Sequence, residues 1–215
     1  MDSIEKYKNL IVNLPVELNS AKISKEIWKR VEYEDKSTIE NLIFGNDEFV
    51  EISREKIFEE KDNIKKKIIM ILMWGYPTGG RGNNIQTFLK EFNTIINILT
   101  SIYQKKLSYD EGIEIMNELN RIKGLGISTW TKLLYFFEVS IDSNRCQIFD
   151  LKIVASLNKQ QFNDFEQISW KQDIEHYLKY NEVVEKIARD LSVTHPDKIE
   201  LFLFIFNLGF LFKNS

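Results

Sequence analysis

Helical periodicity is the feature that most constrains the fold of this chain. Apolar residues recur three and four positions apart along most of its length, as they do on one face of an α-helix. The clearest stripes are Ile85, Phe88, Leu89, Phe92, Ile96 and Leu99, then Ile115, Leu119 and Ile122, then Trp130, Leu133, Leu134 and Phe137. Further helical patterns cover 21–33, 37–44, 53–73, 151–157, 166–190 and 196–212, and no convincing pair of alternating strands is present. We therefore expect an all-α fold.

Length and composition set the size of that fold. With 215 residues, the chain can form one compact domain or two small helical lobes that share an interface. Apolar residues make up 43% and aromatic residues 13% of the chain, enough to fill a substantial core. We predict a single unit over residues 1–215, built as a two-lobed helical bundle.

Composition also excludes several kinds of site. The single cysteine, Cys146, can neither form an internal disulfide nor supply a four-cysteine iron–sulfur site. His176 and His195 lie far apart in sequence, which argues against a zinc site, so we expect no metal. Residues 1–10 lack the apolar stretch of a signal peptide, and 199–212 is too short to span a bilayer and is typical of a buried helix. We expect a cytoplasmic monomer that does not contact a membrane.

The net charge of −3 argues against a broad nucleic-acid-binding face, because neutralising phosphates normally requires a basic surface. The densest basic run, Lys65 to Lys67, is most simply a solvated helix face. Any contact with DNA would therefore depend on backbone N–H groups and a few well-placed lysines.

Two glycine-rich segments interrupt the helical pattern. Residues 74–84 hold four of the nine glycines, and Gly124-Leu125-Gly126-Ile127-Ser128 holds two more. Glycines cluster where the backbone needs a positive φ or must approach another group closely. We expect the functional residues to lie at these two segments.

The second glycine segment joins two expected helices. The Ser-x-x-Glu pattern at Ser108 predicts a capping box that opens the first helix. After the tight turn, Ser128 or Thr129 is expected to cap a second helix that ends near residue 138. Residues 108–138 are thus predicted to form a helix, a glycine hairpin and a helix.

Such a hairpin suits phosphate binding. Glycine lacks a Cβ atom, so a phosphate can approach the backbone, and the unpaired N–H groups and dipole of the second helix favour an anion there. The simpler alternative is a plain turn with glycine at a helix C-cap. The expected phosphate contacts are Lys123, Gly124, Gly126, Ser128 and Thr129.

This part of the chain resembles the helix-hairpin-helix DNA glycosylases, in a shortened form of the 8-oxoguanine-glycosylase-like fold. The resemblance lies in the segments 122–129, IKGLGIST, and 148–154, IFDLKIV. The family carries a hairpin of the form Leu-Pro-Gly-Val-Gly, followed by an aspartate that opens the next helix. Asp150 follows Ser128 by 22 residues, slightly more than is usual, and Lys123 stands where proline is usual.

The resemblance implies that Asp150 is catalytic. A carboxylate beside C1′ stabilises the positive charge that develops on the sugar, and it can orient or deprotonate an attacking water. The plain alternative is a helix N-cap, a role compatible with catalysis. Ser128 stands where bifunctional members carry a Schiff-base lysine, which implies simple hydrolysis. Ser128 and Lys132, one turn further on, are the accessory candidates.

The first glycine segment resembles the asparagine-rich wedge loop of the 8-oxoguanine glycosylases. Arg81, Asn83 and Asn84 would hydrogen-bond the base left unpaired when its partner is flipped out. Trp74 and Tyr76 could stack on the flipped base. The alternatives are a helix N-cap with turn glycines and two core aromatics. Known members have several helices between wedge and hairpin, whereas this chain has essentially one.

The leading hypothesis is a monofunctional DNA glycosylase that hydrolyses the N-glycosidic bond of a damaged or modified base in double-stranded DNA. It would serve base excision repair, for example of oxidised guanine, or the removal of modified bases from invading phage DNA. We expect no cofactor, apart from a monovalent cation that the hairpin carbonyls could hold. The alternatives are a non-catalytic helix-hairpin-helix DNA-binding module, in which Asp150 is only a cap, and an interaction scaffold with no DNA role.

Overall fold

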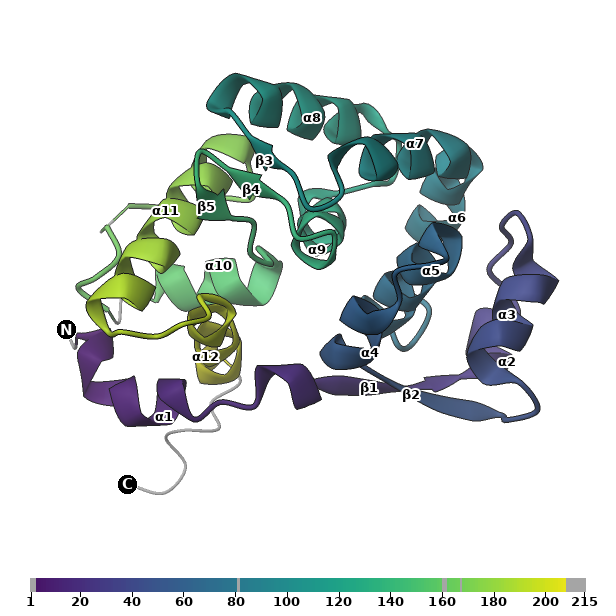
Figure 1. The fold of residues 1–215 in the computed structure, drawn as a ribbon, viewed down its shortest axis with the longest axis horizontal. Helices are drawn as coiled ribbons and strands as arrows, with labels where there is room; N and C mark the ends of the chain where they lie inside the picture. Colours follow the sequence, from purple (N-terminus) through teal and green to yellow (C-terminus); the bar gives the residue numbers. More distant parts are fainter. Residues whose placement is uncertain (1–2, 81, 160–161, 167, 208–215) are drawn as a thin grey trace.

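The computed structural model describes residues 3–80, 82–159, 162–166 and 168–207, and this part of the chain is mainly helical (Figure 1). The α-helices are α1 (Lys8–Val12), α2 (Lys25–Trp28), α3 (Lys36–Phe44), α4 (Arg54–Glu59), α5 (Ile64–Gly75), α6 (Asn84–Phe88), α7 (Phe92–Ile102), α8 (Tyr109–Arg121), α9 (Ile127–Phe136), α10 (Leu151–Asn158), α11 (Ile174–Asp190) and α12 (Asp197–Asn207). The 3-10 helices are η1 (Ile4–Tyr7), η2 (Val16–Leu18) and η3 (Leu89–Glu91). The strands are β1 (Ser20–Ser24), β2 (Phe49–Ser53), β3 (Lys106–Leu107), β4 (Ser140–Ile141) and β5 (Asn144–Arg145).

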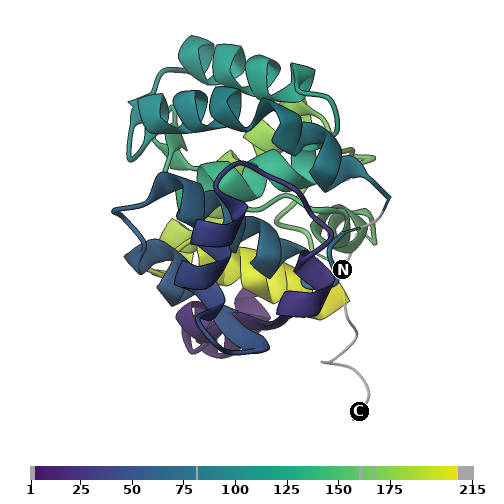
Figure 2. The same ribbon diagram turned by 90° about the vertical axis from the view of Figure 1, so that its right-hand side faces the viewer.

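Helix α9 lies in the middle of the molecule (Figure 1). The helices α10, α11 and α12 lie on one side of it, and the N-terminal α1 packs against α12. On the other side α5 packs against α9 and against the β1–β2 pair. Both views place α7 and α8 over the same end of the molecule (Figure 2). Segments from the whole length of the chain therefore meet around α9.

Two small sheets correct the expectation of a purely helical fold. β1 and β2 form an antiparallel ladder from Ser20↔Ser53 to Ser24↔Phe49, and β3, β4 and β5 form a second sheet of very short strands. The alternation within a five-residue strand is too brief to stand out from a helical pattern. In addition, β2 follows β1 only after two intervening helices, so the sequence offers no hairpin signal.

Several helix boundaries also differ from those expected. The stretch 21–33 is strand β1 followed by the short α2, and 53–73 divides into α4 and α5. At that division the side chain of Asn63 accepts a hydrogen bond from the backbone of the new helix. The helix expected over 166–190 begins only after Asp173, which caps it in the same way. Capping side chains thus start new helices within stretches that the apolar pattern predicts to be one continuous helix.

The capping box of α8 is confirmed. Ser108 Oγ accepts from the Glu111 N–H at 3.3 Å, and Glu111 Oε2 accepts from the Ser108 N–H at 2.7 Å. Further along α8, a Cβ atom on Gly112 would lie 2.6 Å from the side chain of Ile141. The lack of a side chain at Gly112 therefore lets α8 lie close against strand β4.

The cap expected for the second helix is wrong. The N-cap of α9 is Gly126, whose extended backbone directs its carbonyl to the N–H groups of Thr129 and Trp130, at 2.8 and 3.1 Å. The helix therefore starts two residues earlier than expected. Ser128 lies within its first turn, and no side chain caps that turn.

The core is built around α5, α9 and α12. The predicted stripe of α9 is confirmed, since Trp130, Leu133, Leu134 and Phe137 are all fully buried. The apolar C-terminal segment is a buried helix as far as residue 206, and the expected remainder from 208 to 212 lies outside the described residues. No helix in the described part of the chain is long and apolar enough to cross a membrane.

The basic run at the start of α5 is not a solvated face throughout. Lys67 is 1% exposed, and its Nζ atom lies 5.2 to 5.9 Å from the ring centres of Phe58, Tyr103 and Phe137. Within the described residues this Nζ has no hydrogen-bond partner. Burial lowers the pKa of Lys67 to about 8, although Glu138 and Glu60 oppose that shift.

We predict that Lys67→Met raises the melting temperature at pH 7. The wild-type fold must bury an ammonium group there, whereas the unfolded chain keeps it hydrated. Because the folded pKa lies below the unfolded value of 10.5, wild-type stability should rise with pH between about 8 and 10.5, narrowing the gap to the variant. Thermal melts across this range test the prediction. A variant that is less stable than wild type at pH 7 would contradict it.

Candidate active site

A cavity of about 330 Å³ brings together residues from both glycine segments and from the start of α10. Its lining includes five of the residues predicted from the sequence, namely Trp74, Tyr76, Ser128, Lys132 and Asp150. The two aromatics come from the end of α5, Ser128 and Lys132 from α9, and Asp150 from the cap of α10. Residues that are separate in the sequence therefore share one site.

The two carboxylate oxygens of Asp150 make different contacts. Oδ1 accepts hydrogen bonds from the N–H groups of Lys152 and Ile153, at 2.9 and 3.1 Å, and so caps α10. Oδ2 lies 3.8 Å from Lys132 Nζ, and the side chain keeps 16% of its surface exposed. The cap fixes one oxygen and leaves the other beside Lys132, in a residue that lines the cavity.

The amine of Lys132 is surrounded by acceptors. Its Nζ donates to the carbonyl oxygen of Ser128 at 2.7 Å and to its hydroxyl at 3.1 Å, and Asp150 Oδ2 lies beside it. The amine also lies 5.7 Å from the centre of the Tyr76 ring. A Cβ atom on Gly75 would approach Lys132 Cδ to 3.0 Å, so this glycine provides space for the lysine stem.

The hairpin presents backbone to solvent. Lys123 and Gly126 are exposed and Gly124 is half-buried. Since no side chain caps α9, the first N–H groups of that helix remain available to an anion. The hydroxyl of Thr129 instead points inward, 2.6 Å from the Tyr76 hydroxyl, so only its backbone lies in the turn.

The hairpin also contacts the expected wedge loop. Gly124 has φ +88°, and a Cβ atom there would lie 2.8 Å from the carbonyl oxygen of Asn84. Asn83 and Asn84 are exposed at the start of α6 and are not part of the cavity lining. Arg81 lies outside the described residues. The structure therefore places the backbone of Asn84 beside the hairpin, and neither asparagine lines the cavity.

The lining also includes residues that were not predicted, among them Arg54, Lys152, Glu200 and Phe204. Lys152 follows Asp150 by two positions, and its Nζ lies 4.4 Å from the centre of the Phe204 ring. A lysine so close to the candidate catalytic carboxylate was a usable sequence signal. Glu200 was another, because it is the one charged residue of the apolar stretch 199–206 and charges are rarely buried unpaired.

A buried ion pair contributes to the cavity wall. Arg54 Nη2 lies 2.8 Å from Glu200 Oε2, and the two side chains are 2% and 1% exposed. Arg54 Nη1 donates to the Tyr135 hydroxyl at 3.1 Å, and that hydroxyl donates to Asp197 Oδ2 at 2.9 Å. The guanidinium also lies 5.2 Å from the centre of the Trp74 ring. The network links α4, α5, α9 and α12.

Burial dominates the electrostatics of this pair. It raises the pKa of Glu200 to about 7, with Arg54 opposing the shift and the negative charges of Asp150 and Asp197 adding to it. Burial also opposes the charge of Arg54, but Glu200 and Tyr135 outweigh it and raise the Arg54 pKa above its usual range. Arg54 is therefore a permanent cation, and Glu200 is an unusually basic carboxylate.

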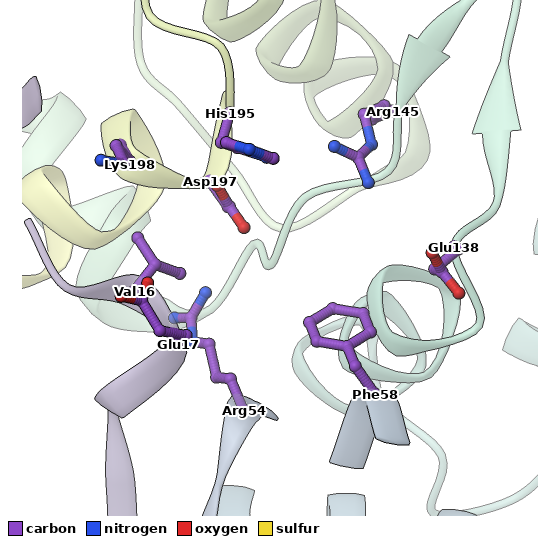
Figure 3. Close-up of a pocket in the computed structure, with 9 residues that line it drawn as sticks. All are labelled: Val16, Glu17, Arg54, Phe58, Glu138, Arg145, His195, Asp197 and Lys198. Atoms are coloured by element: carbon purple, nitrogen blue, oxygen red, sulfur yellow. The ribbon is translucent and has the colours of Figure 1, made fainter. Parts of the chain in front are cut away.

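A second cavity, of about 350 Å³, shares Arg54 with the first (Figure 3). Arg145, His195 and Asp197 line it from β5 and from the region where α12 begins, and none of the predicted site residues does. Its charged side chains are of both signs. Because Asp150 and Lys132 line only the first cavity, the first cavity is the candidate active site. Among the described residues, no group of three or more His, Cys, Asp or Glu side chains could hold a metal ion.

Residues 15–204 match the family described as "Putative 8-oxoguanine DNA glycosylase OGG-like protein". The chain belongs to this family. The match includes the hairpin and Asp150, so the resemblance drawn from those residues is confirmed. No curated protein and no solved structure matches the chain.

The two hairpin glycines provide a matched pair of variants. We predict that Gly124→Ala lowers the melting temperature by several degrees, because a left-handed backbone costs an alanine about 1–2 kcal/mol and its Cβ would collide with the Asn84 carbonyl. Gly126→Ala should lower the melting temperature less, since nothing lies within 4 Å of its Cβ position and its φ is −78°, so the variant loses only the preference of an N-cap for glycine over alanine. Thermal melts of both variants decide the matter, and equal melting temperatures would refute this account of the hairpin.

Proposed function

We propose that the protein is a DNA glycosylase that hydrolyses the N-glycosidic bond of a damaged or modified base flipped out of double-stranded DNA. One observation carries the proposal: Asp150 lines an aromatic-lined cavity and keeps Oδ2 free of its capping role, beside Lys132. The family match supports the same activity class. Removal of oxidised guanine in repair and removal of modified bases from phage DNA are the two biological settings we propose.

The proposed cleavage of the N-glycosidic bond follows from the different contacts of the two Asp150 oxygens. As the bond to the base breaks, positive charge develops on the sugar, and a fixed carboxylate oxygen beside C1′ stabilises it. The two backbone N–H groups on Oδ1 fix the orientation of Asp150 before the substrate binds, so little reorganisation is needed. The same carboxylate can accept a proton from the attacking water.

The hairpin would position the DNA. A phosphate bound at the uncapped start of α9 lies close to the cavity, because Ser128 belongs both to that first turn and to the cavity lining. Lys123 on the hairpin and Lys152 on α10 supply positive charge nearby. Gly126→Ala, whose added methyl would obstruct a phosphate but not the fold, tests this directly by DNA binding. One chain holds the whole site, in keeping with a monomer.

We predict that Asp150→Asn reduces base release by about 10²–10³-fold while leaving DNA binding intact, because it removes the charge that stabilises the transition state. Asp173→Asn controls for the loss of a capping carboxylate, since Asp173 caps α11 and lies outside the cavity; because it lines a hollow beside Gly126 and Ile127, only its base release per bound duplex is compared. Single-turnover release from a panel of lesion-bearing duplexes, with mass spectrometry of the free bases, measures the effect and identifies the base. Binding without release by wild type would favour the non-catalytic module.

Lys132 favours a second candidate activity, in which its amine attacks C1′ and strand cleavage follows. We expect hydrolysis alone, because three acceptors surround the amine in a way that suits an ammonium ion and not a nucleophile. Borohydride should then trap no covalent adduct, and the strand should break only after hot alkali. An adduct formed by wild type and absent in Lys132→Met would instead assign Lys132 as the nucleophile.

A further inference from the structure

Arg30 is an exposed arginine whose side chain is held by the first glycine segment. It lies just after α2, and its Nη2 donates to the carbonyl oxygen of Thr78 at 2.9 Å. Gly79 has φ +79°, and a Cβ atom there would lie 2.8 Å from the same nitrogen, so the glycine leaves room for the guanidinium. Because this contact already restricts the side chain, Arg30 would lose less conformational entropy on binding a ligand than a free arginine does.

Arg30 forms no ion pair within the described part of the chain. The carboxylates nearest to it in sequence are each paired with a lysine: Glu26 with Lys29, Glu32 with Lys36, and both Glu34 and Asp35 with Lys65. The bond to Thr78 uses only one of the N–H donors of the guanidinium, and the described residues accept no other. Arg30 therefore offers an anion several charged donors on a side chain whose orientation is already set.

The segment that follows α2 is bonded on both sides of the expected wedge loop. Arg30 binds the carbonyl before the loop, and Gln86 binds the same segment from α6, just after the loop. The Gln86 side chain accepts from the Glu32 N–H at 2.8 Å and donates to the Glu32 carbonyl oxygen at 2.9 Å. The end of the loop also contacts the hairpin through its backbone. The wedge loop is thus attached to residues 30–32 as well as to the hairpin.

This arrangement suits the passage of the second DNA strand beside Arg30. In the proposed function, the hairpin and the cavity hold the strand that carries the flipped base, and Asn83 and Asn84 fill the gap in the duplex. Side chains that fill such a gap lie between the two strands, so the complementary strand would pass on the side of the loop away from the hairpin. Figure 1 shows α2, which Arg30 follows, on the side of α5 that faces away from α9.

We infer that Arg30 binds a backbone phosphate of the complementary strand, the strand that carries the unpaired base. This inference rests on the proposed function. A guanidinium is charged at every physiological pH, and its planar fork can donate to two oxygens of one phosphate. Since the same guanidinium holds the Thr78 carbonyl, the bound phosphate and the wedge loop would keep a constant distance from each other. A charged contact at this point also adds to the few that a chain of net charge −3 can direct at DNA.

The first test measures how DNA binding depends on salt. The probe is a duplex with one tetrahydrofuran abasic analogue, which has no glycosidic bond to cleave. Arg30→Gln should raise Kd about tenfold and reduce the slope of log K against log salt by about 0.9, the contribution of one phosphate. Arg30→Lys keeps the charge and should restore the slope. Lys29→Gln is the matched control, because it removes a neighbouring exposed charge that pairs with Glu26, and it should keep the wild-type slope. Equal slopes in Arg30→Gln and Lys29→Gln would overturn the inference.

The second test identifies the strand. Single phosphates of either strand are replaced, one at a time, by uncharged methylphosphonates in the same probe. Wild type should lose affinity at a position of the complementary strand near the abasic analogue, and Arg30→Gln should be insensitive there, because its contact is already missing. Coupling of Arg30 to a phosphate of the other strand, or to none, would contradict the assignment.

These measurements separate the phosphate contact from the glycosylase proposal. If wild type shows the coupling but frees no base from any lesion-bearing duplex, the glycosylase proposal fails and the contact stands. If wild type frees a base while Arg30→Gln binds DNA as wild type does, the contact fails and the glycosylase proposal stands. Thermal melts verify that the variants are folded, which is expected because Arg30 is exposed and a glutamine amide can still donate to Thr78.

Discussion

The site depends on the burial of α9. This helix is enclosed on nearly every side, yet it begins at an exposed glycine turn. The aliphatic part of Lys132 is therefore buried, and the residue lines a cavity whose lining also includes Ser128 from the first turn of the helix. Because the packed core fixes the glycine turn and Asp150 relative to each other, an anion bound at the turn would be held in a constant position relative to the reacting carboxylate.

Only a few of the charged side chains in the described part of the chain are buried, and at the cavity the surrounding structure compensates them. The amine of Lys132 meets Ser128 and Asp150, and Arg54 meets Glu200 and Tyr135. Lys67 is the contrast, since aromatic rings surround it and no described acceptor does. The pairs at the cavity hold functional groups in defined orientations, whereas the buried amine of α5 serves no part of the proposed chemistry. A net charge of −3 is compatible with DNA binding when recognition relies on such local features.

Much of the candidate site could be predicted because its signals are local. The glycine turn, the spacing to Asp150 and the aromatic pair Trp74 and Tyr76 are visible in short stretches of sequence, and the structure brings Ser128, Asp150 and the two aromatics to one cavity, although the turn glycines do not line it. The position of Lys132 one turn after Ser128 was also visible. Arg54 escaped prediction because nothing near it in sequence indicates a partner, and the pairing of β1 with β2 escaped because two helices separate the strands.

The sequence by itself determined the helical character of the chain, the capping box of α8 and the glycine turn before α9, because each arises from interactions within a few residues. It also determined that Asp150 caps a helix. Only the tertiary structure decided that the second carboxylate oxygen faces Lys132, and that Glu200 and Arg54 meet as buried charges. The physical reason is that burial and ion pairing depend on packing between distant segments, which no local pattern specifies.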